Sequence, residues 1–317
     1  MRHALHLVIG VLVSGGISCV CTVKKRAAAR SVMDGLQSVQ SLQASCRRHE
    51  QVPGLPGQSN DVIVCGDVAT AKKHVIFFGG DVQDYPERMS NHRDNKRYLQ
   101  WNLENTAEIL LKRFQDSAVF VIKPSTMHLN TFSVYSNFVE TNDFGSPTHS
   151  RFPRAWIHLK PLHCTVVSQE LAIHSGSSGK EACDTEVPLI LIGFSKGCIV
   201  LNQMLYSLSL ALGDPKTKDF VNQVEEFYWL DGGHSGGHGN TWISDTESLQ
   251  NLSQLKTRIH VHVTPYQVHD PMRTWVGKEE KKFVSKLKKF GADITETLHF
   301  DDLPPSIENH FGVLKEF

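Results

Sequence analysis

One short segment has the residue types of an activated nucleophile. Residues 193–197 read Gly-Phe-Ser-Lys-Gly, with Ser195 at the centre. A serine hydroxyl is a weak nucleophile, so it needs a neighbouring base and a backbone that exposes it. A tight turn from a strand into a helix exposes the hydroxyl, and the flanking Gly193 and Gly197 leave room for close packing at such a turn. Ser195 is therefore the predicted nucleophile of an acyl-transfer reaction.

The surroundings of this segment decide how much weight it carries, because Gly-x-Ser-x-Gly strings are common. An ordinary glycine-rich turn with a capping serine would read the same way. Here an apolar run over 187–192 precedes the segment, and a helical pattern over 198–212 follows it. This strand–turn–helix context is the one that a nucleophile turn requires.

An acid and a histidine should follow the serine in that order. Asp270 is the predicted acid, since it lies just beyond the predicted strand 258–263, where a carboxylate can orient an imidazole. Asp231, at the end of the predicted strand 227–230, is the alternative. The sequence leaves open that Asp270 only starts a turn before Pro271.

His310 is the predicted base, since it follows the last predicted strand and the break at Pro304-Pro305. It would take the proton of Ser195 and return it to the leaving group. His299, at the end of that strand, is the alternative. The chain has 17 histidines, so a histidine near the required place is expected by chance and does not by itself identify the base.

Acyl transfer also needs backbone donors for the developing oxyanion. Gly79 and Gly80 follow the predicted strand 75–78, where such enzymes supply one donor, and the amide of Lys196 would supply the other. The two glycines could equally serve only to turn the chain. The side chain of Lys196 receives no role from the sequence.

Two histidine groupings could suggest zinc: His234 with His238, and His260 with His262 on one face of a strand. No thiolate or carboxylate set completes either group. A loop lining the site and ordinary strand positions explain them better. The sequence therefore predicts no metal and no cofactor.

The elements that must position these residues alternate along the chain. Short β-rich apolar runs alternate with amphipathic helical patterns, which predicts an α/β fold with a mostly parallel sheet and helices on both faces. The predicted strands are residues 61–65, 74–78, 118–122, 187–192, 227–230, 258–263 and 292–300, and the predicted helices are residues 97–114, 155–173, 198–212 and 278–290.

The predicted organisation is a targeting presequence over 1–30, a linker over 31–58 and one domain over 59–317. Basic residues without acidic ones before Asp34 favour a mitochondrial presequence, and the compact apolar region leaves a secretory signal as the alternative. The aromatic, aperiodic segment 125–154 is read as an excursion that could overhang the site as a lid.

Composition limits the partners. With 33 basic and 33 acidic side chains, the chain has no overall field to attract nucleic acid. Its seven cysteines are scattered without a CxxC pair, so no disulfide framework is expected. The basic helix over 278–289 could make peripheral membrane contact, although a solvated outer face is the simpler reading. Nothing indicates the oligomeric state.

Because the serine turn, the acid and the histidine follow one another in this order, the chain resembles the α/β-hydrolase superfamily over roughly residues 60–317. More narrowly, residues 77–81 (FFGGD), 193–198 (GFSKGC) and 229–234 (WLDGGH) resemble a vertebrate family catalogued as open reading frame sixty-nine of chromosome two. That family is mitochondrial and tied to respiratory-chain integrity, which the resemblance implies and the composition does not show. Its motifs do not reveal a substrate.

Two functions are consistent with these patterns. The first is a serine hydrolase that acts on a small-molecule or lipid-like ester, thioester or amide through an acyl-enzyme at Ser195. The second is a non-catalytic descendant that keeps the turn for structural reasons and acts as a binding or assembly factor in mitochondria. Fold alone cannot decide between them.

Overall fold

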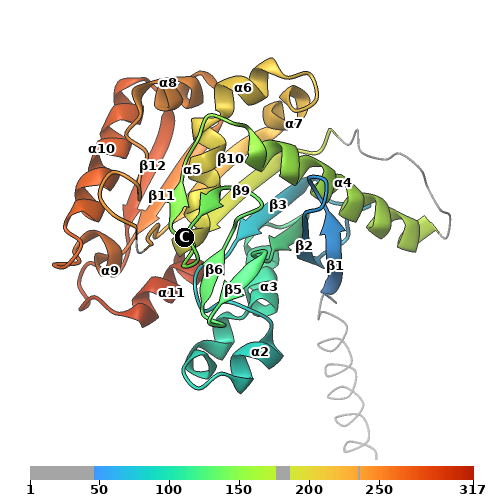
Figure 1. Cartoon of the computed structure of the whole chain (residues 1–317), viewed down its shortest axis with the longest axis horizontal. Coiled ribbons are helices and arrows are strands. Elements are labelled where there is room, and N and C mark those ends of the chain that lie inside the picture. Colours follow the sequence, from blue (N-terminus) through green and yellow to red (C-terminus); the bar gives the residue numbers. More distant parts are fainter. Residues whose placement is uncertain (1–45, 176–185, 235) are drawn as a thin grey trace, which may run out of the picture. The chain divides into compact units, whose positions relative to one another are not determined.

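The computed structural model describes residues 46–175, 186–234 and 236–317. The predicted presequence and most of the predicted linker lie outside the described residues. Within them, eight strands form one sheet in the order β1-β2-β4-β3-β9-β10-β11-β12 (Figure 1). The strands are β1 (Arg47–Pro53), β2 (Ser59–Cys65), β3 (Lys73–Phe78), β4 (Ser117–Ile122), β9 (Leu189–Phe194), β10 (Val224–Leu230), β11 (Arg258–Val263) and β12 (Asp293–Leu298).

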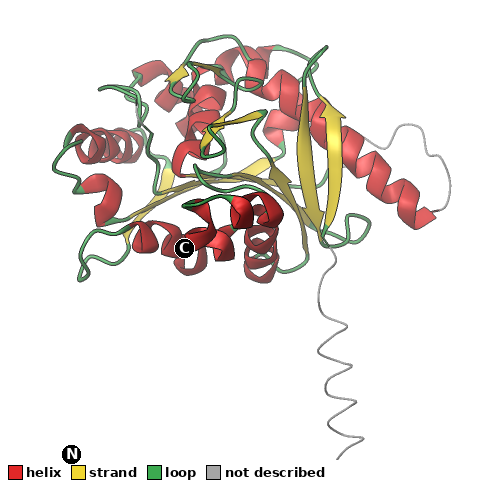
Figure 2. Cartoon of the chain, turned by 60° about the horizontal axis from the view of Figure 1, so that its bottom comes forward, coloured by secondary structure: helices red, strands yellow, loops and turns green. Residues whose placement is uncertain are grey.

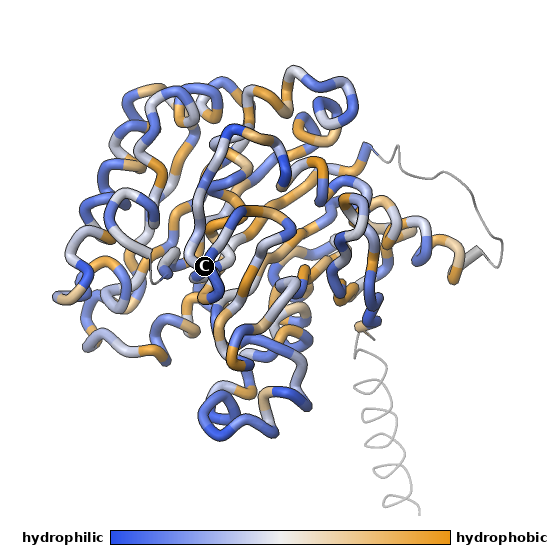
Figure 3. Tube along the Cα trace, viewed as in Figure 1, coloured by the Kyte–Doolittle hydropathy of each residue, from blue (hydrophilic) through white to orange (hydrophobic). Residues whose placement is uncertain are grey.

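The sheet is mostly parallel, with antiparallel strands at one edge. The pairs β1·β2 and β2·β4 are antiparallel. From β4 onward in the sheet order, the neighbouring strands β4, β3, β9, β10, β11 and β12 are parallel to one another. Strands β4 and β9 are buried along their whole length, which explains their continuous apolar sequences. In Figure 3 the hydrophobic segments run along the central strands, and the surrounding loops are mainly hydrophilic.

Helices cover both faces of this sheet (Figure 2). Helices α4 (Arg154–Ser175), α5 (Cys198–Tyr206), α8 (Thr246–Gln254) and α10 (Trp275–Lys289) contribute to one apolar core, and α3 (Leu103–Arg113) and α11 (Ile307–Glu316) to the other. The shorter helices are α2 (Pro86–Asn91), α6 (Leu208–Gly213), α7 (Lys218–Asn222) and α9 (Pro265–Val268). The chain has the α/β-hydrolase fold, as predicted.

The strand order also explains where a site can form. From β3 the chain crosses through α3 to β4 on one side, and from β9 it crosses through α5 to β10 on the other. The connections leave the neighbouring strands β3 and β9 in opposite directions, so a crevice opens at their carboxyl ends. Residues 79–82 and the turn at Ser195 both begin at this edge.

Three sequence predictions need correction. Residues 47–53, predicted within the linker, form β1. The sequence pattern does not indicate this strand, because it lies at the sheet edge and most of its side chains are exposed. Cys46 and Cys65 form a disulfide beside it, although no disulfide was expected. The predicted helix 97–114 is split into a 3-10 helix, Asn95–Trp101, and α3, because the side chain of Asn102 accepts a hydrogen bond from the Asn105 amide and starts a new helix.

The excursion 125–154 folds into two small antiparallel sheets. Strands β5 (Thr126–His128) and β6 (Phe132–Val134) form one, and β7 (Glu140–Thr141) and β8 (Pro147–Thr148) form the other. Its aromatic residues Tyr135 and Phe138 are buried against Phe78 of β3, with ring centroids 5.9 and 5.2 Å away. This excursion is therefore anchored in the core. No helix among the described residues has the length and apolar character needed to cross a membrane.

Candidate functional site

Ser195 occupies the predicted sharp turn between β9 and α5. Its φ of 52° lies in the left-handed region, which L-residues other than glycine rarely adopt. The flanking glycines are required by the packing: a Cβ on Gly193 would lie 2.8 Å from the Cα of Cys198, and one on Gly197 would lie 2.0 Å from the carbonyl oxygen of Phe78. The backbone strain at Ser195 is thus maintained by two close backbone contacts.

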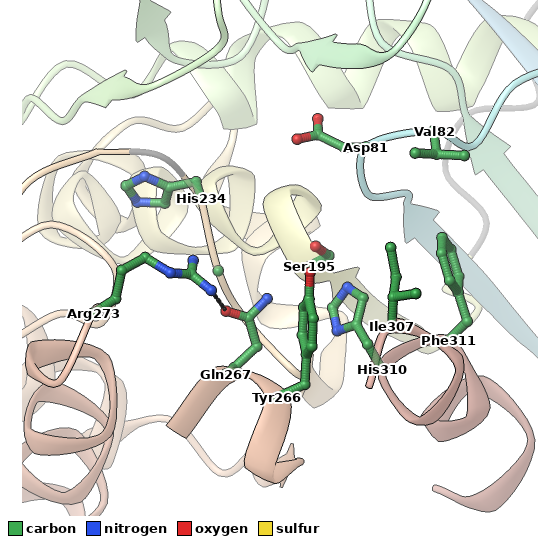
Figure 4. A pocket seen from close by; sticks show the side chains of 11 residues that line it. Asp81, Val82, Ser195, His234, Tyr266, Gln267, Arg273, Ile307, His310 and Phe311 are labelled. Atoms are coloured by element: carbon green, nitrogen blue, oxygen red, sulfur yellow. Dashed lines mark hydrogen bonds between the residues drawn. The ribbon is translucent and has the colours of Figure 1, made fainter. Parts of the chain in front are cut away.

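His310 lies in the first turns of α11. The side chain of Ser306 caps this helix by accepting a hydrogen bond from the Asn309 amide at 3.1 Å. The imidazole lies between two aromatic rings, with centroid distances of 4.7 Å to Phe194 and 5.0 Å to Tyr266. These contacts fix the ring beside Ser195, as Figure 4 shows.

Asp231 is the carboxylate that contacts the histidine. It follows β10 directly and is fully buried. Its Oδ2 lies 2.6 Å from Nδ1 of His310, and its two oxygens also accept hydrogen bonds from the amide (2.7 Å) and hydroxyl (2.6 Å) of Thr264. Three donors therefore hold the carboxylate in a position where it can orient the imidazole.

Asp270, the acid predicted from the sequence, does not contact His310 in this structure. Its Oδ2 accepts a hydrogen bond from Nε of Arg273 at 2.6 Å, and its Oδ1 accepts one from the Met272 amide. The strand β11 ends at Val263, so α9 separates Asp270 from the carboxyl edge of the sheet, whereas Asp231 lies on that edge beside β9. Position directly after a buried strand was the signal that favoured Asp231.

His299, the alternative base, belongs to a different cluster. Its Nε2 lies 2.8 Å from Nδ1 of His262, and the two rings stack. The structure thus brings Ser195, His310 and Asp231 together, and leaves Asp270 and His299 in other interactions.

Of the two predicted oxyanion glycines, Gly80 has its amide engaged within the protein. The amide of Gly80 donates to the side-chain oxygen of Gln83 at 3.0 Å, and the carbonyl of Gly79 accepts from the hydroxyl of Tyr135. A Cβ on Gly80 would lie 2.7 Å from the Cβ of Ser195, so this glycine makes room for the Ser195 side chain. At the next position, within the part of the chain that the structure describes, no acceptor faces the amide of Asp81.

Lys196, next to Ser195, is buried and forms an ion pair with the partly exposed Asp81. Its Nζ lies 2.7 Å from Oδ1 of Asp81 and donates to the carbonyl of Phe144 at 2.8 Å. The same Asp81 oxygen accepts a hydrogen bond from the Ser133 amide, and the Ser133 hydroxyl donates to the carbonyl of Gly80. Burial raises the pKa of Asp81 and lowers the pKa of Lys196, and their pairing opposes both shifts. Lys196 therefore ties the excursion 125–154 to the loop beside Ser195.

This ion pair predicts a non-additive effect on stability. Lys196→Met leaves the Asp81 carboxylate without its cation, and we expect a loss of about 2 kcal/mol in the free energy of unfolding, since Asp81 is partly exposed. The double variant with Asp81→Asn should recover most of that loss, because it removes the unpaired charge. Urea unfolding of the wild type, both single variants and the double variant measures the coupling. Additive losses would contradict a direct pairing.

A pocket of about 340 Å³ lies beside Ser195. Ser195, His310 and Asp81 line it together with His234, Gln267 and Arg273, as Figure 4 shows. Burial lowers the pKa of His234 to about 4, so this ring is neutral near pH 7. Arg273, Gln267 and Asp81 were not identified as site residues from the sequence, because they come from loops whose positions depend on the fold.

The whole sequence is also similar to known proteins. The C2orf69 family matches residues 48–187 and 164–293. The mitochondrial protein C2orf69 homolog of Mus musculus is 40% identical over 311 residues, covering 84% of this chain and 85% of its own. The chain belongs to the C2orf69 family. This confirms the family resemblance stated from the motifs.

Two further relatives agree. The human mitochondrial protein C2orf69 is 38% identical over 343 residues, covering 87% of this chain and 89% of its own, and the Danio rerio homolog is 38% identical over 304 residues, covering 89% of each chain. All three relatives are named as mitochondrial proteins, in agreement with the mitochondrial location predicted from the presequence.

Solved esterases resemble the backbone. Esterase Est22 is 13% identical with a TM-score of 0.46, covering 95% of this chain and 89% of its own, and esterase PE8 is 15% identical with a TM-score of 0.39, covering 80% and 95%. At these values the likeness says nothing about chemistry.

The histidine groupings have local partners. His234 accepts a hydrogen bond from the Gly236 amide and lies 3.1 Å from the carbonyl of Asn240. His238 packs on Trp275, and His260 contacts Glu226. Across residues 46–175, 186–234 and 236–317, no three His, Cys, Asp or Glu side chains are arranged to hold a metal ion.

Proposed function

We propose that this protein is a serine hydrolase that cleaves an ester, thioester or amide through an acyl-enzyme at Ser195. One observation carries the proposal. Ser195, strained at the tip of a strand–helix turn, lines the same pocket as His310, and the buried carboxylate of Asp231 lies 2.6 Å from that histidine. The α/β-hydrolase fold supports this reading and would not suffice for it.

The reaction follows from the tautomer that Asp231 selects. A carboxylate only accepts, so Nδ1 of His310 carries the proton and Nε2 is left unprotonated to act as the base. Nε2 takes the proton of Ser195 as its Oγ bonds to the substrate carbonyl carbon. The bond to the leaving group then breaks and Nε2 protonates that group. Water, deprotonated by Nε2, adds to the acyl-enzyme and releases the acid and free Ser195.

The oxyanion would be stabilised by the amides of Asp81 and Lys196, and the predicted Gly80 is set aside because its amide donates to Gln83. Lys196 lies in the first turn of a 3-10 helix, where amides have no partner within the helix. The Asp81 amide is unengaged by the described residues, whereas the neighbouring amides of Gly80 and Val82 donate to Gln83 and to the Thr131 carbonyl. Two donors fixed before the reaction are what acyl transfer requires.

The proposed function also includes a biological role, a substrate class and a membrane contact. The family resemblance implies a role in respiratory-chain integrity, and a small or lipid-like acyl substrate fits the size of the pocket. Peripheral contact of α10 with an anionic membrane is compatible with the lysines in its last turn.

A fluorophosphonate activity probe tests the proposal on the full chain. We expect covalent labelling of the wild type and its complete loss in Ser195→Ala, because the probe bonds to the activated hydroxyl. Ser90→Ala is the matched control, since that exposed serine of α2 only donates to a nearby carbonyl. If the folded wild type stays unlabelled where other serine hydrolases react, the protein is a non-catalytic member of the fold and acts by binding or assembly.

A further inference from the structure

Arg273 is a charged residue of the pocket wall that the hydrolytic steps do not use. It lies between α9 and α10 and lines the same pocket as Ser195 and His310. In Figure 4 it lies to the left of Ser195, beside Gln267, while Asp81 lies above Ser195. A guanidinium and the Ser195 hydroxyl thus line one pocket of about 340 Å³, the size of a small substrate.

Two neighbouring side chains hold the guanidinium of Arg273 in place. Its Nε donates to Asp270 at 2.6 Å, and its Nη2 donates to the side-chain oxygen of Gln267 at 3.1 Å. Gln267 is itself buried, and Asp270 is fixed by the Met272 amide at 2.8 Å. Because two of its nitrogens are fixed, this arginine loses little further conformational freedom when it binds a ligand.

The remaining donors of Arg273 suit an anion. Among the described residues, Nη1 has no hydrogen-bond acceptor, and this nitrogen carries two N–H groups. The carboxylates nearest the reacting atoms are already engaged, Asp81 by Lys196 and Asp231 by His310. His234, which also lines this pocket, is neutral near pH 7. Among the described residues that line the pocket, Arg273 is therefore the cation available to a substrate.

We propose that Arg273 determines the specificity of this pocket, and that the substrate of Ser195 carries a carboxylate or phosphate group near the bond that is cleaved. The inference rests on the proposed hydrolase function and names its substrate class. An arginine reads both oxyanions with the same planar donors.

Two pairs of esters test the charge and its source. The first compares 4-nitrophenyl hexanoate with mono-4-nitrophenyl adipate, in which a carboxylate replaces the terminal methyl group. The second compares 1-hexanoyl glycerol with 1-hexanoyl glycerol 3-phosphate, which has a phosphate on the alcohol side. We expect kcat/KM of the wild type to be about ten- to a hundredfold higher for the anionic member of at least one pair, as a charge-assisted hydrogen bond would give.

Arg273→Met should abolish this preference mainly through KM, and Arg273→Lys should retain part of it. Arg93→Met, which removes an equal charge from an exposed residue outside the pocket, should keep the wild-type preference. If the wild type cleaves neutral esters but shows no anionic preference, or if Arg273→Met lowers both members of a pair equally, Arg273 is only a structural clamp and the inference is wrong. If neither ester pair nor the fluorophosphonate probe reacts, the hydrolase proposal itself fails.

Discussion

Asp231→Asn should slow fluorophosphonate labelling and ester hydrolysis by roughly 10⁴-fold, the size of effect seen when the acid of such a triad becomes an amide. The amide nitrogen of an asparagine can donate to Nδ1 of His310, which would place the ring proton on Nε2 and leave no base facing Ser195. The rate constant for probe labelling measures the loss, and thermal unfolding of the same sample verifies that the protein is folded.

Asp270→Asn is the informative comparison, because Asp270 was the acid predicted from the sequence. Its carboxylate contacts Arg273 and the Met272 amide, so the same chemical change should slow labelling by less than about tenfold. Equal losses in the two variants would contradict the assignment of Asp231. A larger loss in Asp270→Asn would restore the original prediction.

Gly197→Ala is expected to have the largest effect on stability. The added Cβ would lie 2.0 Å from the carbonyl oxygen of Phe78, a backbone atom of the central strand β3 that cannot move aside cheaply. We expect a loss on the order of 3 kcal/mol in the free energy of unfolding, at the upper end of the cost of overpacking. The turn would also shift, so labelling of Ser195 should fall in whatever protein stays folded.

Gly213→Ala provides the matched control. Gly213 ends α6, and apart from its chain neighbours and the backbone of its own helix no atom of the described residues lies within 4 Å of the place that its Cβ would occupy. The same substitution there should leave stability unchanged or raise it slightly, because alanine loses less backbone entropy than glycine. Urea unfolding of both variants measures the difference. A Gly197→Ala protein as stable as Gly213→Ala would show that the turn is less tightly packed than the structure indicates.

Most of the architecture could be read from local patterns. The central strands are buried on both faces, so residues 118–122 and 187–192 are continuously apolar and identify themselves. Strand β1 could not be recognised in this way, because an edge strand with exposed side chains has a polar sequence that resembles a linker. The disulfide between Cys46 and Cys65 was missed with it, since spacing alone does not reveal which cysteines are adjacent in space.

The residues of the candidate site also differ in whether local sequence was enough to predict them. The turn at Ser195 is a local structure, and its glycines, flanking strand and following helix are contiguous in the chain, so local sequence was enough to predict this turn and to propose Ser195 as the nucleophile. His310 was also predicted, because the required chain order places a histidine after the last strand. The acid depended on the lateral order of the strands, which puts β10 directly beside β9, and a strand's neighbours are not written in its own residues.

The partner of His310, the pairing of Lys196 with Asp81 and the place of Arg273 in the pocket follow from the folded chain. The two ion pairs join residues that are far apart in the sequence, Lys196 and Asp81 by 115 positions and His310 and Asp231 by 79. A residue type and its local spacing can specify a turn, a strand or a helix. The charge that a buried side chain faces depends on which loops meet at the edge of the sheet, and that is a property of the folded chain.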